Sequence, residues 1–309
     1  MSYVALEKHG RSTARLVTRR NRVSRLAIMH RPMQTLAVKP LPQFQLKELK
    51  GHSGCRVFLC ECGNTRFVKK VSGATGYDQR LEQQMLKQRE FEHSWIRKPL
   101  VYEFGKENDR FYFLMEYVNG VQLSTFISRN TVRDVDAIID QLLTFVRSNI
   151  CDETADFSTP INEKLWSISS TSNFQIDRYV QYCLAFDWRA IPTGYCHGDL
   201  SFENILVHRS NLYFIDFLDS FIETPYLDLS KLLLDILVLW SWRFEKRRPI
   251  IKNAHIYDMV LSQLESREVE IVRRFLVLNL LQILPYANAN GNSLFVQDAL
   301  EHLAVKFNI

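Results

Sequence analysis

The chain has 309 residues, of which 46% are apolar and 24% are charged. This is ordinary globular composition in a chain long enough for one large domain or two smaller ones. It excludes a disordered tail protein, a collagen-like chain and a disulfide-rich miniprotein. The net charge of +5 is uneven, because the first 50 residues hold eleven Lys or Arg against two Asp or Glu. No apolar run reaches the roughly 18 residues that a membrane helix needs, so we expect a cytoplasmic protein without a transmembrane segment.

The first 45 residues are expected to form a basic extension in front of the fold. Between positions 15 and 26 arginines alternate with apolar residues, which on a helix would set an arginine-rich face beside a thin apolar one. One interpretation of this pattern is docking to an anionic membrane surface or to nucleic acid, but the apolar stripe is too thin to anchor much, which favours the alternatives. The alternatives are a frayed tail, or a true start at Met29 or Met33.

Residues 46–118 predict a small antiparallel sheet with one helix. β-branched and aromatic runs on either side of a Gly-Asn turn indicate a hairpin, and helical spacing follows. A second strand pair comes next. The expected elements are strands Arg56–Cys60 and Thr65–Val71, a helix Asp78–Trp95, and strands Pro99–Phe104 and Arg110–Tyr117.

Residues 119–309 are predicted to be mostly helical, with one short strand pair at Ile205–Val207 and Leu212–Ile215. The expected helices are Val132–Phe145, Asn173–Phe186, Leu227–Trp242, His255–Glu265, Glu268–Leu284 and Leu294–Val305. A sheet followed by helices places the chain in the α+β class.

The most specific pattern is H-G-D-x-x-x-x-N from His197 to Asn204, followed by an apolar strand that ends at Asp216. The four fixed positions match by chance about once in 500 chains of this length. A loop carboxylate at Asp199 could accept the proton of an attacking hydroxyl. The amide oxygen of Asn204 and the carboxylate of Asp216 are hard ligands, suited to the Mg²⁺ that accompanies a polyphosphate. The pattern therefore predicts phosphoryl transfer from ATP.

These residues resemble the catalytic loop and metal-binding strand of the aminoglycoside phosphotransferase and choline kinase-like family. The resemblance runs from Leu49 to Asp235, about 60% of the chain. It implies small-molecule kinase activity and a bilobal protein kinase-like fold, with residues 46–118 as the N-lobe and 119–309 as the C-lobe. The implied roles are the catalytic base for Asp199, magnesium ligands for Asn204 and Asp216, and structural support of the loop for His197 and Asp228.

Residues that could hold the nucleotide appear in the order expected of a kinase. Ser53 and Gly54 lie in a short loop whose backbone N–H groups could approach phosphates. Lys69 is favoured as the strand lysine that binds the α- and β-phosphates, because it follows an apolar pair. Strand alternation points Lys70 to the opposite face, so only one of the two can serve.

The helix and the hinge complete this resemblance. Glu82 is the best-placed acid to pair with the strand lysine, with Glu90 second, although Gln84 stands where the family often carries its acid. The backbone of Glu116 and Val118 resembles the hinge that hydrogen-bonds adenine, with Met115 at the back of the pocket.

The acceptor is predicted to be a small molecule. Only twelve positions separate Asp216 from Asp228, no A-P-E follows, and Gly198 replaces the arginine of protein kinases. Ser201, Glu203 and Asp219 are expected to face the acceptor.

Several classes of acceptor and two alternative activities of the protein stay open. Acids at the acceptor site would suit an amino alcohol or an aminoglycoside, and Trp240 or Trp242 could hold a choline-like cation. A sugar or a cell-envelope intermediate fits equally well. We expect no specific nucleic-acid partner. The alternatives to an enzyme of this kind are a pseudokinase and a divergent protein kinase acting as a regulatory binding protein.

Overall fold

The computed structural model describes residues 45–49, 54–171, 174–287 and 291–309. The expected basic extension, apart from its last residue, and Ser53 lie outside these ranges.

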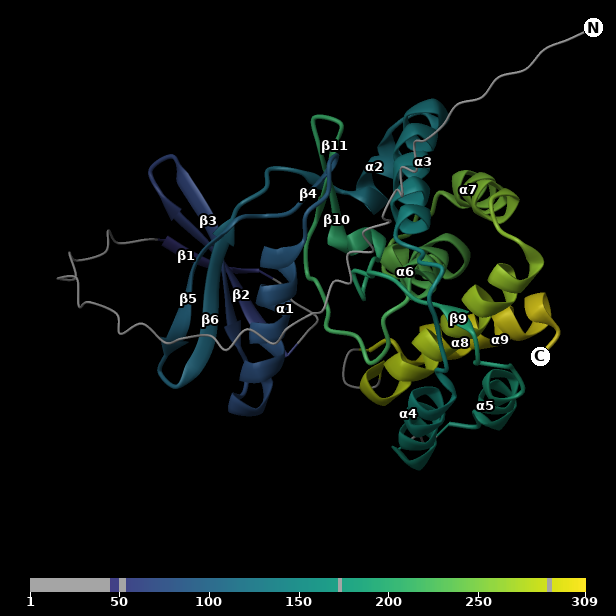
Figure 1. Cartoon of the computed structure of the whole chain (residues 1–309). Coiled ribbons are helices and arrows are strands. Elements are labelled where there is room, and N and C mark those ends of the chain that lie inside the picture. The colour runs from purple at the N-terminus through teal and green to yellow at the C-terminus, as the bar shows by residue number, and fades with distance from the viewer. Residues whose placement is uncertain (1–44, 50–53, 172–173, 288–290) are drawn as a thin grey trace, which may run out of the picture. The chain divides into compact units, whose positions relative to one another are not determined.

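A five-stranded antiparallel sheet opens the described chain, as the sequence predicted (Figure 1). Its strand order is β1-β2-β3-β6-β5, and β2 and β3 turn at Gly63, which has a positive φ of 57°. The strands are β1 (Gln45–Leu49), β2 (Cys55–Cys62), β3 (Thr65–Ser72), β5 (Val101–Glu107) and β6 (Arg110–Glu116).

Helix α1 (Asp78–Glu90) packs on this sheet through Leu81 and Met85, which share a small core with Phe113 and Met115. The expected helix reached Trp95, but α1 ends five residues earlier. Phe91 takes an extended conformation and instead enters the larger core of the helical part, where its ring contacts several aromatic rings. The burial of this one side chain therefore ends the helix.

A second sheet joins the two parts of the chain. Its order is β4-β11-β10-β7, and β4, which follows α1, runs parallel to β11. The strands are β4 (Ile96–Arg97), β7 (Val121–Gln122), β10 (Ile205–His208) and β11 (Asn211–Phe214); a further short pair is β8 (Thr154–Ala155) and β9 (Ile191–Pro192). The expected strand pair after the catalytic motif is present as β10 and β11.

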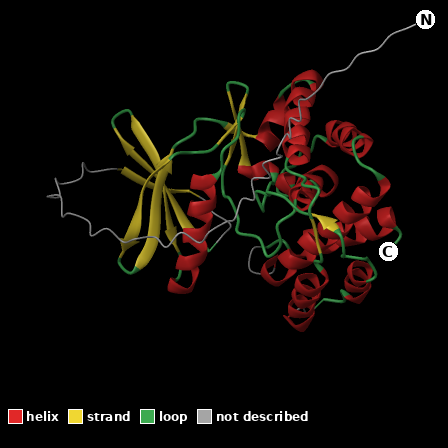
Figure 2. Ribbon diagram, viewed as in Figure 1, coloured by secondary structure: helices red, strands yellow, loops and turns green. Residues whose placement is uncertain are grey.

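Helices make up most of the remaining described chain and gather on the side away from the first sheet (Figure 2). None of the helices in the described ranges is long and apolar enough to cross a membrane. They are α2 (Leu123–Arg129), α3 (Val132–Ser148), α4 (Ser158–Thr171), α5 (Asp177–Leu184), α6 (Pro225–Leu233), α7 (Ile250–Ser262), α8 (Ser266–Ala287) and α9 (Ser293–Phe307).

The expected helix Leu227–Trp242 is broken. Regular α6 ends at Leu233, a π-helical turn follows, and Leu239 adopts a positive φ of 62°. The cause is Asp235, whose Oδ1 accepts the backbone N–H of Ser241 at 2.7 Å. A side-chain acceptor replaces the regular helical hydrogen bond, so the chain can turn here.

Packing of α9 gives a test of this core. Leu303 is fully buried, whereas Val305 on the same helix is 86% exposed. Leu303→Ala should lower the free energy of unfolding by about 2–5 kcal/mol, because it leaves a cavity. Val305→Ala, the matched control, should change it by about 0.5 kcal/mol or less. Urea unfolding measures both, and equal effects would contradict this packing.

Candidate active site

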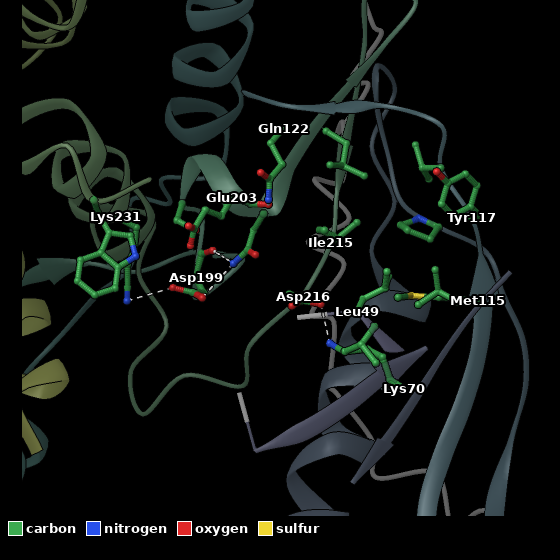
Figure 3. A pocket seen from close by; sticks show the side chains of 18 of the residues that line it. Leu49, Lys70, Met115, Tyr117, Gln122, Asp199, Glu203, Ile215, Asp216 and Lys231 are labelled. Atoms are coloured by element: carbon green, nitrogen blue, oxygen red, sulfur yellow. Dashed lines mark hydrogen bonds and ion pairs between the residues drawn. The ribbon is translucent and has the colours of Figure 1, made fainter. Parts of the chain in front are cut away.

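A cavity of about 530 Å³ lies between the first sheet and the helical part (Figure 3). The sheet side supplies an apolar wall and one lysine, and the other side supplies the polar residues of the motif. The residues that line the cavity include Val57, Val68, Lys70, Met115, Asp199, Asn204, Asp216 and Lys231. The structure thus brings the three motif residues Asp199, Asn204 and Asp216 to one cavity.

Asp199 sits on a tight loop. The preceding Gly198 has a φ of +90°, and a Cβ there would stand 2.4 Å from the carbonyl oxygen of Leu218, so only glycine fits. The amide Nδ2 of Asn204 donates to the Asp199 backbone oxygen at 2.8 Å and to its carboxylate Oδ2 at 3.0 Å. Because the amide nitrogen is engaged with Asp199, the Asn204 amide oxygen remains as a ligand for a metal ion.

Lys231 of α6 forms an ion pair with Asp199, Nζ to Oδ1, at 3.1 Å. Burial alone would raise the pKa of Asp199, but the charge and hydrogen bond of Lys231, helped by Asn204, outweigh it and hold that pKa below its usual value. The carboxylate is therefore ionised at neutral pH. Sequence reasoning missed Lys231, because a lysine on a helix after the motif is commonly a surface residue.

Asp216 follows β11 and has a positive φ of 61°, in the left-handed region that aspartate adopts more readily than most other residues. Its Oδ1 lies 2.5 Å from Nζ of Lys70 (Figure 3). Lys70 is 3% exposed, and although burial would lower its pKa, Asp216 keeps that pKa above the usual value.

The structure places Lys70, rather than the expected Lys69, at the cavity. Lys69 points to the other face of the sheet and pairs with Glu107 at 2.5 Å. Lys70 pairs in register with buried Phe113 of β6, and this places it on the inner face. We therefore replace Lys69 by Lys70 as the candidate phosphate-binding lysine.

The expected acid on α1 is also corrected. Glu82 and Glu90 are exposed, and buried Gln84 contacts the Tyr77 hydroxyl at 3.4 Å. Within the described chain, no carboxylate of α1 contacts Lys70. Instead Lys87 of α1 binds across to the helical part, with its Nζ 3.0 Å from the Leu218 carbonyl oxygen and 2.8 Å from Glu223 Oε1.

Buried side chains brace the catalytic loop from below. Asp228 accepts the backbone N–H groups of His197 at 2.5 Å and Gly198 at 2.8 Å. The His197 ring bridges the Ile215 carbonyl oxygen, at 2.9 Å from Nε2, and the Asp199 N–H, at 3.3 Å from Nδ1. This arrangement assigns the ring as neutral, with its proton on Nε2. His197 and Asp228 therefore lie where the supporting roles require.

A third support, Asp235, was not expected from the sequence. Its Oδ2 accepts the backbone N–H of Phe202 at 2.6 Å, so it holds the loop between Asp199 and Asn204. Burial raises the pKa of Asp228 and of Asp235 to about 7 and lowers that of His197 to about 4. The only sequence feature that could have indicated this role of Asp235 is its place as an acid within an apolar helical segment.

The remaining expected residues divide between two cavities and the surface. Met115, Glu116 and Val118 line the first cavity, as do Ser201 and Glu203, whereas Gly54 lines an adjoining one. Asp219 is exposed and lines neither. Of the two tryptophans, Trp240 lines both cavities and Trp242 is buried in the core, where its indole donates to Ser128.

Few side chains at the first cavity could serve as ligands for a metal ion. Among the residues that the structure describes, no three carboxylate, imidazole or thiol groups gather closely enough to hold a metal ion. The amide oxygen of Asn204 and the carboxylate of Asp216 would hold Mg²⁺ only together with phosphate or water oxygens, which is the usual way this ion is bound.

The buried histidine makes the unfolding free energy depend on pH. His197 stays neutral in the folded chain down to about pH 4, whereas in the unfolded chain it gains a proton near pH 6.5. The unfolded state therefore binds more protons between these values, and the histidine costs the folded state about 3 kcal/mol by the lower pH. The stability advantage of wild type over His197→Gln should shrink as pH falls from 6.5 to 4.

Urea unfolding across this pH range measures the difference, with His302→Gln on the exposed face of α9 as the matched control. Asp228 and Asp235 titrate in wild type and variant alike, so they cancel in the comparison. A difference that stays constant with pH would contradict the neutral, buried assignment of His197.

The sequence matches the model of the phosphotransferase enzyme family over residues 56–258, about two thirds of the chain. A search of curated proteins finds no match.

Solved structures of similar fold include three kinds of kinase. One is a thermostable aminoglycoside phosphotransferase APH(4)-Ia in complex with AMP-PNP and hygromycin B, at 15% identity and a TM-score of 0.61, covering 86% of this chain and 94% of that one. The GDP complex of aminoglycoside 2'-phosphotransferase-IIIa has 18% identity and a TM-score of 0.59, covering 85% and 93%. Choline kinase LicA from Streptococcus pneumoniae has 15% identity and a TM-score of 0.54, covering 84% and 94%.

At these identities the likeness shows the fold, which is the bilobal kinase-like fold that the catalytic motif implied. Because the family model matches about two thirds of the chain, the chain belongs to the phosphotransferase enzyme family.

Proposed function

We propose that the protein is an ATP- and magnesium-dependent phosphotransferase that acts on a hydroxyl group of a small molecule. The acceptors considered are an amino alcohol, an aminoglycoside, a sugar and a cell-envelope intermediate. The observation that carries this proposal is the convergence of Asp199, Asn204, Asp216 and Lys70 on one cavity. Family membership and the nucleotide complexes of the structural neighbours support it.

The nucleotide would enter from the side of the first sheet. Val57, Val68 and Met115 offer an apolar place for the base, and the backbone of Glu116 and Val118 offers hydrogen bonds at its edge. Lys70 reaches the α- and β-phosphates from the sheet. Mg²⁺, held by Asn204 and Asp216, would neutralise the charge of the phosphates when bound.

Asp199 takes the acceptor proton. The hydroxyl oxygen of the acceptor attacks the γ-phosphorus, the bond from that phosphorus to the β,γ-bridging oxygen breaks, and ADP leaves. The hydroxyl proton passes to the ionised Asp199 carboxylate, whose pKa is held low by Lys231. Positioning and charge neutralisation supply most of the catalysis in reactions of this kind.

One observation favours a second candidate. Lys70 has no acid partner on α1, because Glu82 is exposed, and a pseudokinase that only binds ligands could tolerate this. A thermal-shift titration separates the two. The enzyme should be stabilised by ATP more strongly with Mg²⁺ than without it, whereas a pseudokinase without a metal site should show no such difference.

Removal of the catalytic base gives the main test. Asp199→Ala should keep Mg²⁺-dependent ATP binding and lose about 10²–10⁴-fold in the rate of ATP turnover, because general base catalysis contributes that much. Asp140→Ala, which changes an exposed aspartate of α3 that lines neither cavity, is the matched control and should keep the wild-type rate. Coupled ADP release measures both variants. An Asp199→Ala protein as active as wild type would exclude this mechanism.

Two adjacent lysines test the nucleotide side. Lys70→Met should lower kcat/KM for ATP by on the order of 10²-fold, because a preorganised cation at the phosphates is lost. Lys69→Met, which faces away from the cavity, should stay within about twofold of wild type. Steady-state kinetics with ATP varied measures both, and thermal unfolding checks that each variant folds. A larger loss at Lys69 would restore the original assignment.

A further inference from the structure

A second cavity of about 620 Å³ adjoins the first. Lys231, Trp240, Arg243 and Ile283 line both, so the two spaces meet beside Asp199. The nucleotide is proposed to fill the sheet side of the first cavity. The second cavity is therefore the space from which an acceptor hydroxyl can reach Asp199.

The charged side chains of this second cavity all carry positive charge. They are Arg80 of α1, Lys164 of α4, Lys231 of α6 and Arg243, and no carboxylate is among its described lining residues. Two of these cations already have carboxylate partners in the first cavity. Lys231 pairs with Asp199 at 3.1 Å, and Arg243 pairs with Glu203 at 2.8 Å.

Arg80 and Lys164 differ from the other two cations. Neither pairs with a carboxylate of the described chain; Arg80 stacks over the Tyr77 ring and Lys164 over the Phe221 ring. Burial lowers the pKa of Lys164, and the charge of Arg80 lowers it further, so the two cations repel one another. An anion placed between them would remove this repulsion.

Polar groups without partners also face this space. The Gln282 Nε2 and the Asn292 Oδ1 are buried and have no hydrogen-bond partner among the residues that the structure describes, and both residues line the second cavity. Buried polar atoms are normally paired, so this amide donor and this amide acceptor are available to hydrogen-bond a ligand or water in the cavity. A polyhydroxylated compound offers both donors and acceptors for them.

We propose that the acceptor is an anionic hydroxyl compound, such as a sugar acid or a sugar phosphate, whose carboxylate or phosphate group binds between Arg80 and Lys164 while a hydroxyl faces Asp199. This inference rests on the proposed function and narrows its acceptor. A polycation such as an aminoglycoside would place its ammonium groups beside two unpaired cations, which disfavours it.

Anion binding tests the site without requiring turnover. The wild-type chain is saturated with Mg²⁺ and AMP-PNP, so that the nucleotide site is filled, and titrated with sulfate as the probe for phosphate and with malonate as the probe for carboxylate. Calorimetry should show binding of at least one probe. Arg80→Gln and Lys164→Gln should each weaken it by about tenfold, the usual effect of losing a charged hydrogen bond.

Arg89→Gln is the matched control, because Arg89 is exposed on the same helix as Arg80 and lines neither cavity. It should bind the anions as wild type does. Absence of binding, or an equal loss in all three variants, overturns the proposal. So does a loss of AMP-PNP affinity with unchanged anion binding, which would assign these cations to the nucleotide phosphates.

Acceptor charge is then varied on one scaffold. Phosphoryl transfer from ATP is compared for glucose, glucosamine, glucuronate and glucose 6-phosphate, and the two acids separate the carboxylate from the phosphate source. We expect at least one acid to be used more than about tenfold better than glucosamine, and Arg80→Glu with Lys164→Glu to reverse this order. Preference for glucosamine overturns the proposal. Failure of ATP to stabilise the protein in the presence of Mg²⁺ would instead refute the kinase function, and the anion titration repeated on nucleotide-free protein would then test the anion site alone.

Discussion

The geometry of the site depends on buried carboxylates that accept backbone N–H groups of the catalytic loop. Asp228 holds the loop at His197 and Gly198, and Asp235 holds it at Phe202. Asp199 lies between these anchored residues, and Asn204 follows two positions after Phe202. The anchored backbone therefore fixes where both side chains lie. Two carboxylates are costly to bury, and the cost is offset by hydrogen bonds from backbone groups that would otherwise be unpaired. Neither Asp228 nor Asp235 lines the cavity, but together they position Asp199 and Asn204, which do.

Charged side chains that line the first cavity form three ion pairs. Lys70 binds Asp216, Lys231 binds Asp199, and Arg243 binds Glu203. The charge of Lys231 keeps the pKa of Asp199 below its usual value before any ligand arrives, which suits an acid that must take a proton as a base. The same pairing leaves the cations close to where phosphate oxygens would lie.

The sequence predicted the parts of the site that are contiguous in the chain. The motif from His197 to Asn204, the strand before Asp216 and the acid at Asp228 have fixed spacings. Local structure brings Asp199, Asn204 and Asp216 to the cavity, and Asp228 holds the loop behind it. Residues that depend on long-range packing were less predictable. Strand alternation separates Lys69 from Lys70, but only pairing with β6 decides which one faces inward. Asp235 resembled part of an amphipathic helix, because its partner Phe202 lies 33 positions away. Helix α4 was missed, although its buried Ile161, Leu165 and Ile168 have helical spacing.

Helix α1 links the two ligand sites in an unexpected way. A helix acid paired to the strand lysine would tie α1 to the nucleotide alone. Here Lys87 ties α1 to Leu218 and Glu223, in the loop after Asp216, while Arg80 on the same helix lines the second cavity. The loop after Asp216 and the second cavity are therefore both in contact with α1, the first through Lys87 and the second through Arg80.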